Sequence, residues 1–280
     1  MSNPVFSNSA VFGEPRRGAQ GKGGTATAPS PYTQYGTSGA QATDAASLQN
    51  MYNAPSAGPV DTQRLTYTDV IMKTAGLFAL LVVVAAASWS LTEAFPGVWV
   101  FGMIVGLVLG LVNAFKKNPS PVLITLYAIA QGVFLGGISK MFETMADGIV
   151  LQAVLATLSV FAVSLALFSS GKVRVTPKFT RWLLISMVGY LVFSLVNVVL
   201  VWTNVLQGWG MRGGTLGILI GLFAVGLAAA MLMVDFDSIK RGVEGGAPAK
   251  FAWSAAFGLM VTLIWMYLEI LRLLAILRGD

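Results

Sequence analysis

Seven long apolar stretches alternate with short polar segments along the chain. Prolines fall at or near several of the breaks, at Pro96, Pro119, Pro121 and Pro177, where helices can begin or end. Each stretch is close to the roughly 20 residues that cross a bilayer core when a helix rises 1.5 Å per residue. The pattern predicts an all-α membrane protein with seven transmembrane helices. To within a few residues, the stretches cover 70–92, 97–115, 121–141, 149–169, 180–202, 214–236 and 252–277.

The segment before the first apolar stretch has a different composition. Residues 1–62 are rich in Ser, Gly, Ala, Thr, Pro, Gln and Asn and show neither helical nor alternating periodicity. Such a segment cannot bury enough apolar surface to offset the entropy lost on ordering. We expect residues 1–64 to form a disordered cytoplasmic tail and residues 65–280 to form the transmembrane domain. A solvated tail is the favoured interpretation, and a docking segment for a protein partner, through residues 1–62, is the alternative.

Basic residues are concentrated in alternate connecting segments, and the intervening segments carry few of them. Because Lys and Arg accumulate in cytoplasmic loops, this alternation predicts a cytoplasmic N-terminus and, with seven spans, a C-terminus outside. Residues 1–25 contain no apolar signal segment, so we expect insertion into the plasma (cell inner) membrane through the first span. The basic residues concerned are Arg64, Lys73, Lys116, Lys117, Lys172, Arg174, Lys178, Arg181, Lys240, Arg241 and Lys250.

Composition narrows the chemistry. The chain is 55% apolar and 11% charged, whereas charged residues make up about 25% of an average soluble domain. It contains no histidine and no cysteine, which excludes disulfides, Cys/His zinc sites, thiol nucleophiles and Ser-His-Asp triads. We therefore expect no enzyme activity and no cofactor. The net charge of +6 comes largely from short loops, which favours a lipid bilayer as the partner over nucleic acid.

Glycines recur at four-residue steps in three of the predicted helices. Small residues at this spacing let helix backbones approach closely. We expect tight packing within the chain rather than dimerisation, against the alternative that glycine is simply common in membrane helices. The glycines are Gly102, Gly106 and Gly110, then Gly132 and Gly136, then Gly213, Gly217 and Gly221.

Two carboxylates, Asp235 and Asp237, stand where the sixth apolar stretch ends. They are about 200° apart around a helix, so they cannot share a face. Asp237 has Lys240 and Arg241 at i+3 and i+4, which predicts a local ion pair at the membrane surface. Asp235 has no charged neighbour on its own helix, so it is the candidate for the bundle interior. There an ionised carboxylate costs roughly 2.5–3.5 kcal/mol and needs a partner, a water-filled cavity or a proton. An ordinary interfacial aspartate is the equally weighted alternative.

The seventh apolar stretch also carries charges. Glu269 and Arg272 are three residues apart, so an ion pair could neutralise both on one face of a helix. A pinned helix end is the favoured interpretation. The alternative is that Glu269 is a second acidic site that faces a pore.

The sixth span closes in Val234-Asp-Phe-Asp-Ser-Ile-Lys240, and the seventh ends in Leu268-Glu-Ile-Leu-Arg-Leu-Leu-Ala-Ile-Leu277. With the seven spans, these motifs resemble the Bax inhibitor family, also called the transmembrane Bax-inhibitor-motif family. The stretch Tyr127-Ala-Ile-Ala-Gln-Gly-Val-Phe-Leu-Gly-Gly-Ile-Ser139 is similar to the third span of its bacterial branch. The resemblance covers about residues 65–277 and excludes the N-terminal segment.

The resemblance implies a seven-helix fold with the last helix at the centre of the other six. It also implies a calcium leak across the membrane that pH controls. In the family, two aspartates on spans six and seven share a proton near the cytoplasmic side. A basic residue on the cytoplasmic side of span two acts as a latch.

Matched residue by residue, the span-six aspartate falls on Asp235, and the basic latch falls near Lys116 or Lys117. The span-seven aspartate is not present, because counting back from the closing motif places Thr262 there. The shared-proton pair is therefore lost. Glu269 lies seven residues further on and on nearly the same face, but about 10 Å away along the helix axis.

Two hypotheses follow. The first is a passive, pH-modulated cation leak, with Ca²⁺ as the candidate ion and Asp235 as its candidate ligand, since hard cations prefer oxygen ligands. The second is a non-transporting membrane protein that binds and regulates a partner such as a membrane-bound protease. The first assigns an ion or proton site to Asp235, Glu269 and Thr262, and latch or interfacial charges to Lys116, Lys117, Asp237 and Arg272.

Overall fold

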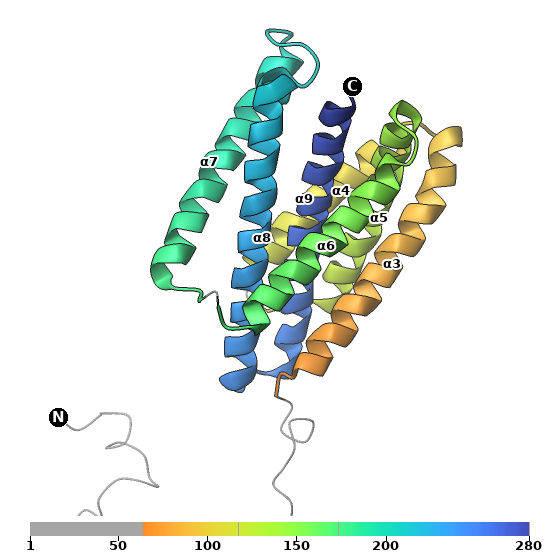
Figure 1. The fold of residues 1–280 in the computed structure, drawn as a ribbon. Coiled ribbons are helices and arrows are strands. Elements are labelled where there is room, and N and C mark those ends of the chain that lie inside the picture. The colour runs from red at the N-terminus through yellow and green to blue at the C-terminus, as the bar shows by residue number, and fades with distance from the viewer. Residues whose placement is uncertain (1–63, 117, 173, 280) are drawn as a thin grey trace, which may run out of the picture. The chain divides into compact units, whose positions relative to one another are not determined.

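The computed structural model describes residues 64–116, 118–172 and 174–279, and this part of the chain is almost entirely helical (Figure 1). Seven of its helices are long and apolar enough to cross a membrane, which confirms the seven-span prediction. The helices are α3 (Tyr67–Ala94), α4 (Val98–Phe115), α5 (Pro121–Met145), α6 (Ile149–Ser169), α7 (Pro177–Trp202), α8 (Gly214–Glu244) and α9 (Ala252–Arg278), with short 3-10 turns η1 (Gly210–Arg212) and η2 (Ala249–Phe251).

The sixth span is longer than its apolar pattern predicts. Helix α8 continues to Glu244, eight residues past the predicted end at 236. Its last two turns are charged, and ion pairs between residues four apart support them, Asp237 with Arg241 and Lys240 with Glu244. Asp235 therefore lies within a continuous helix rather than at the end of one.

The last helix is the most buried of the seven. About 61% of its apolar window is buried, against 6% for α7, and it packs closely against α3, α5, α6 and α8. Figure 1 shows it inside the bundle, with its C-terminal end emerging beside α5. The last helix therefore lies among four of the other six helices, in agreement with the central position that the family resemblance implies.

Helices α4 and α7 are peripheral. Helix α4 packs on α5 and α3, whereas α7 packs on α8 and η1. Only Leu183 and Asn197 are buried on α7. Large apolar side chains on its other faces are more than half exposed, among them Ile185 and Val188. In a bilayer this exposed apolar surface faces lipid chains, which explains why the helix needs so little burial against protein.

Most of the glycines at four-residue steps lie at helix crossings within the chain, as predicted, but Gly213 caps α8 and contacts only its own connection. A Cβ at Gly136 would collide with the carbonyl oxygen of Ala85 and lie 2.8 Å from Ser88 Cβ. One turn earlier, a Cβ at Gly132 would lie 2.8 Å from the carbonyl oxygen of Leu81. Glycine at these two positions lets the backbones of α5 and α3 come into contact.

The basic segments gather at one end of the bundle. Because consecutive spans alternate in direction, α3, α5, α7 and α9 begin at the end where α4, α6 and α8 finish (Figure 1). Lys116 follows the last residue of α4, Lys178 lies in the first turn of α7 and Lys250 lies in η2. We call this the basic end. The predicted disordered tail, residues 1–63 of it, lies outside the described residues.

A wide apolar groove opens between α3 and α6. Its volume is about 1250 Å³, and side chains of α5, α8 and α9 form its floor. Phe78 lines it from α3 and Phe161 from α6. On the floor, Ser139 Oγ and Tyr267 Oη satisfy each other in a hydrogen bond of 2.7 Å. The groove therefore suits lipid chains and is a poor route for a hydrated ion.

We predict that Gly136→Ala lowers the thermal unfolding temperature in detergent, because overpacking a helix crossing typically costs about 1–3 kcal/mol. Gly189→Ala on α7 is the matched control, since a Cβ there meets no atom within 4 Å. It should unfold at the wild-type temperature or above, because alanine favours helix. Equal unfolding temperatures for the two variants would contradict the close α3–α5 contact.

Candidate functional site

Asp235 on α8 faces α9 in the half of the bundle nearer the basic end. Its Oδ2 accepts a hydrogen bond of 2.8 Å from Thr262 Oγ1. Gly258, one turn earlier on α9, lies beside the same carboxylate, because a Cβ there would be 3.8 Å from Oδ1. Position 262, where the family resemblance places a second aspartate, is thus the residue that Asp235 contacts.

The carboxylate of Asp235 has no ion-pair partner among the residues that the structure describes. Asp237, two residues further on, differs: its Oδ2 lies 3.0 Å from Arg241 Nη2. The spacing predicted this local pair, and the structure confirms it. Asp235 is half-buried with a single neutral hydrogen-bond donor, so it retains the capacity to bind a cation or a proton.

The latch residues remain a prediction. Lys116 is exposed at the end of α4, a helix that packs on α5 and α3. Within the described residues it makes no ion pair with Asp235. Lys117 lies outside the described residues.

Glu269 is placed differently from Asp235. Its Oε1 lies 2.6 Å from Arg212 Nη2, and its Oε2 lies 2.6 Å from Arg272 Nη2. Only 6% of its side chain is exposed, so the carboxylate is buried and paired twice. The i,i+3 pair between Glu269 and Arg272 that the sequence predicted is present.

Tyr190 and Arg212 complete this cluster, and the sequence did not single out either residue. Tyr190 Oη donates a hydrogen bond of 2.6 Å to Glu269 Oε1 and accepts one of 2.5 Å from Arg212 Nη2. Arg272 Nη1 donates to the carbonyl oxygen of Arg212 at 3.1 Å. The one available signal was an isolated arginine in an otherwise uncharged connection before α8. We call Tyr190, Arg212, Glu269 and Arg272 the arginine cluster.

The structure does not bring Glu269 to the Asp235 site. Thr262 and Glu269 are seven residues apart on α9, which is about 10 Å along the helix axis. The carboxylate of Glu269 binds groups from α7 and η1, whereas that of Asp235 contacts the middle of α9. Asp235 and Glu269 therefore belong to two separate polar sites along α9.

The Asp235 site alone is a sparse metal site. The described residues contain no group of three or more acidic, His or Cys side chains that could hold a metal ion. Ca²⁺ takes six to eight oxygen ligands. Asp235 and Thr262 could supply only some of them, and the remainder would be water or backbone carbonyls. Such a site fits transient passage of an ion better than tight storage.

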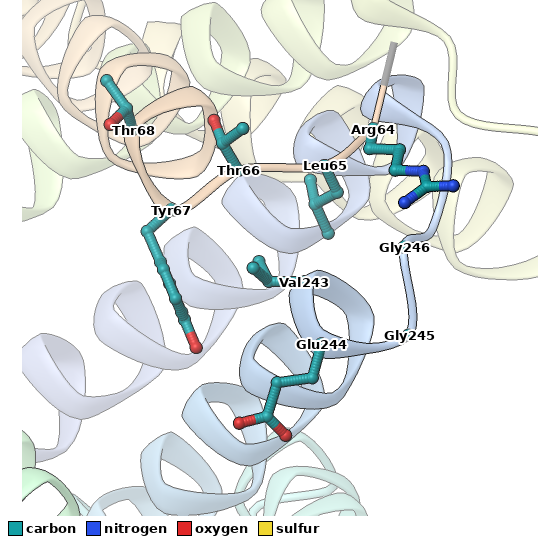
Figure 2. Close-up of a pocket in the computed structure, with 9 residues that line it drawn as sticks. All are labelled: Arg64, Leu65, Thr66, Tyr67, Thr68, Val243, Glu244, Gly245 and Gly246. Atoms are coloured by element: carbon teal, nitrogen blue, oxygen red, sulfur yellow. The ribbon is translucent and has the colours of Figure 1, made fainter. Parts of the chain in front are cut away.

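A second hollow, of about 540 Å³, lies at the basic end, where the chain enters α3 (Figure 2). Leu65 N donates a hydrogen bond of 2.7 Å to the carbonyl oxygen of Ala247, so this segment pairs with the α8–α9 connection. Figure 2 shows Glu244 on the lining, and its carboxylate lies 3.8 Å from Lys240 Nζ. Glu244 is the one acid among the described residues that line the hollow, so the hollow is a weaker candidate than Asp235.

Comparison with known families supports the assignment of the fold. The model of the Bax inhibitor 1 like family matches residues 3–279. The chain belongs to the Bax inhibitor 1 like family. The match begins well before the first span, so the family relationship is wider than the motifs of residues 65–277 indicated. No curated protein matches the chain.

We predict that Glu269→Gln destabilises this family member more than a substitution that breaks an exposed ion pair. The change leaves two arginines in the cluster without a counter-charge, and breaking a buried pair typically costs about 3–5 kcal/mol. The readout is thermal unfolding in detergent.

Glu93→Gln is the control, because Glu93 pairs with Lys140 at 2.6 Å on the exposed surface, where ion pairs contribute little. A Glu269→Gln protein as stable as this control would show that the cluster does not hold the helices together.

Proposed function

We propose that this Bax inhibitor 1 like protein is a passive cation leak, with Ca²⁺ as the ion, and that pH modulates it through Asp235. The supporting observation is the contact between Asp235 and Thr262. It places an unpaired, half-buried carboxylate between α8 and α9 inside a bundle of apolar spans. Isolated ionisable groups in such surroundings usually mark ion or proton pathways.

Proton binding explains the proposed control by pH. The carboxylate of Asp235 can bind either a proton or a cation, and a protonated carboxyl group no longer attracts a cation. The family's shared-proton pair has a neutral hydroxyl, Thr262, in place of its second acid. Asp235 therefore titrates as a single group, and the leak should rise with pH over one transition.

The proposed orientation follows from the basic end. We place this end in the cytoplasm of a cell whose plasma membrane holds the protein, with the C-terminus outside. Asp235 then lies nearer the cytoplasm and the arginine cluster nearer the outside. The protein would work without a cofactor and without catalysing a reaction, and its direct partners would be the bilayer and the permeant ion.

Calcium flux into proteoliposomes tests the proposal. Wild-type protein and Asp235→Asn are compared at about pH 6 and about pH 8, which spans a range where buried carboxyl groups can titrate. We expect wild-type flux to be several-fold higher at the higher pH. Asp235→Asn should abolish this difference and lower the flux roughly tenfold at the higher pH, because the amide carries no charge.

Asp237→Asn is the matched control, because it removes an acid two residues away that pairs with Arg241 at the surface. Its flux should keep the wild-type pH dependence. Equal flux in wild type and Asp235→Asn would refute the ion-site assignment. A protein without flux in all variants would favour the partner-binding hypothesis, which predicts loss of function on deletion of residues 1–62 instead.

Single cysteines test the orientation, because the chain contains none of its own. We expect Thr203→Cys, in the exposed connection before α8, to react with a membrane-impermeant maleimide in intact cells. Ser170→Cys, exposed at the end of α6, should react only after lysis. The reverse pattern would overturn the proposed orientation.

A further inference from the structure

The arginine cluster lies in line with Asp235 along the contact between α8 and α9. On α8, Gly221 and Gly217 precede Asp235 by 14 and 18 residues. These spacings place all three residues on nearly the same face of the helix. A Cβ at Gly221 would lie 3.4 Å from Arg272 Nη2, and one at Gly217 would collide with the carbonyl oxygen of Arg212. The face of α8 that carries Asp235 thus lies against the arginine cluster about 21–27 Å further along the helix.

The cluster holds more positive than negative charge. It contains two guanidinium groups and one carboxylate, all from side chains that are at most 16% exposed. The Nε atoms of both arginines are buried and make no hydrogen bond within the described residues. Tyr190 adds a hydroxyl but no charge. A net charge of about +1 is therefore left in a place from which water is largely excluded.

We propose that this surplus charge is the outer barrier of the leak, and that Arg212 and Arg272 limit the flux of cations that Asp235 admits. This inference rests on the proposed function. A cation that moves from Asp235 along the α8–α9 contact approaches two arginines that a single carboxylate only half neutralises. Repulsion between like charges is several times stronger at a partly buried site than in water, and it acts twice as strongly on a divalent ion.

The local fold holds Arg212 in the path. Met211 N donates a hydrogen bond of 2.7 Å to Asn197 Oδ1, and Asn197 Nδ2 donates to the carbonyl oxygen of Trp209 at 3.2 Å. These bonds fix η1 to α7. Gly210, with φ of 60°, supplies the left-handed turn that brings Arg212 back over the bundle. The hydrogen bonds of the buried Asn197 and the left-handed turn at Gly210 therefore fix the position of Arg212.

The test measures calcium flux in proteoliposomes at about pH 8, the higher of the two pH values in the test of the proposed function. Arg212→Gln removes one charge and leaves Glu269 paired with Arg272, so the remaining pair is neutral. We expect its flux to exceed the wild-type flux by at least about tenfold. Arg272→Gln removes the same surplus from α9 and should have the same effect, which keeps the test decisive if one variant does not fold.

Arg212→Lys is the matched control, because it keeps the charge and changes only the shape. It should leak far more slowly than Arg212→Gln. Tyr190→Phe removes a hydrogen bond without altering charge, and it should also leak far more slowly than Arg212→Gln. If Arg212→Lys leaks as fast as Arg212→Gln, packing rather than charge closes the path and the proposal is overturned. Folded Arg212→Gln and Arg272→Gln proteins that leak at the wild-type rate also overturn it.

The double variant Asp235→Asn with Arg212→Gln separates this inference from the proposed function. A fast leak through Arg212→Gln that Asp235→Asn does not lower supports the barrier and contradicts the role of Asp235. Asp235-dependent flux that neither arginine variant raises contradicts the barrier and leaves the role of Asp235 standing. Absence of flux in every variant contradicts both.

Discussion

The burial of charged side chains on α9 is the constraint on which the rest of the bundle depends. This helix carries Glu269 and Arg272 in a position that is more than 90% buried, and lipid offers no substitute partner. Their charges must be met by protein groups from neighbouring elements. Arg212 from η1 and Tyr190 from α7 meet them, so a peripheral helix with little apolar burial is tied to the centre through polar contacts.

Asp235, unlike Glu269, has no charged partner among the described residues. Thr262 offers it one hydrogen bond and no charge, and the described residues add no counter-ion. A carboxylate left this way in a membrane bundle is costly. An uncompensated carboxylate at this position lowers the stability of the bundle, and a functional role would explain its presence. Glu269, which is more deeply buried and has two arginines beside it, has a structural explanation that Asp235 lacks.

The two sites divide the contact between α8 and α9 into two halves. One half carries Asp235 and lies nearer the basic end, and the other carries the arginine cluster. Close approach of α8 and α9 at Gly217 and Gly221 leaves the half with the arginine cluster tightly packed, whereas a glycine, Gly258, lies beside Asp235. Under the proposed function, a cation would be attracted near Asp235 and would meet tight packing and repulsion at the arginine cluster. A slow leak rather than a fast channel is the behaviour that such an arrangement favours.

The apolar pattern alone predicts the seven spans and their alternation, because hydrocarbon permits only helices of about 20 apolar residues. The glycine spacing predicts the close α3–α5 contact at Gly132 and Gly136, because small residues let backbones approach. The sequence also predicts the pairs Asp237–Arg241 and Glu269–Arg272, since residues three or four apart on a helix are neighbours. It did not determine where α8 ends, because ion pairs extended the helix past its apolar stretch. The contacts of Thr262 with Asp235, and of Tyr190 and Arg212 with Glu269, arise only from the tertiary packing. They join residues 27 to 79 positions apart, and their partners depend on how helices rotate and cross, which no local spacing encodes.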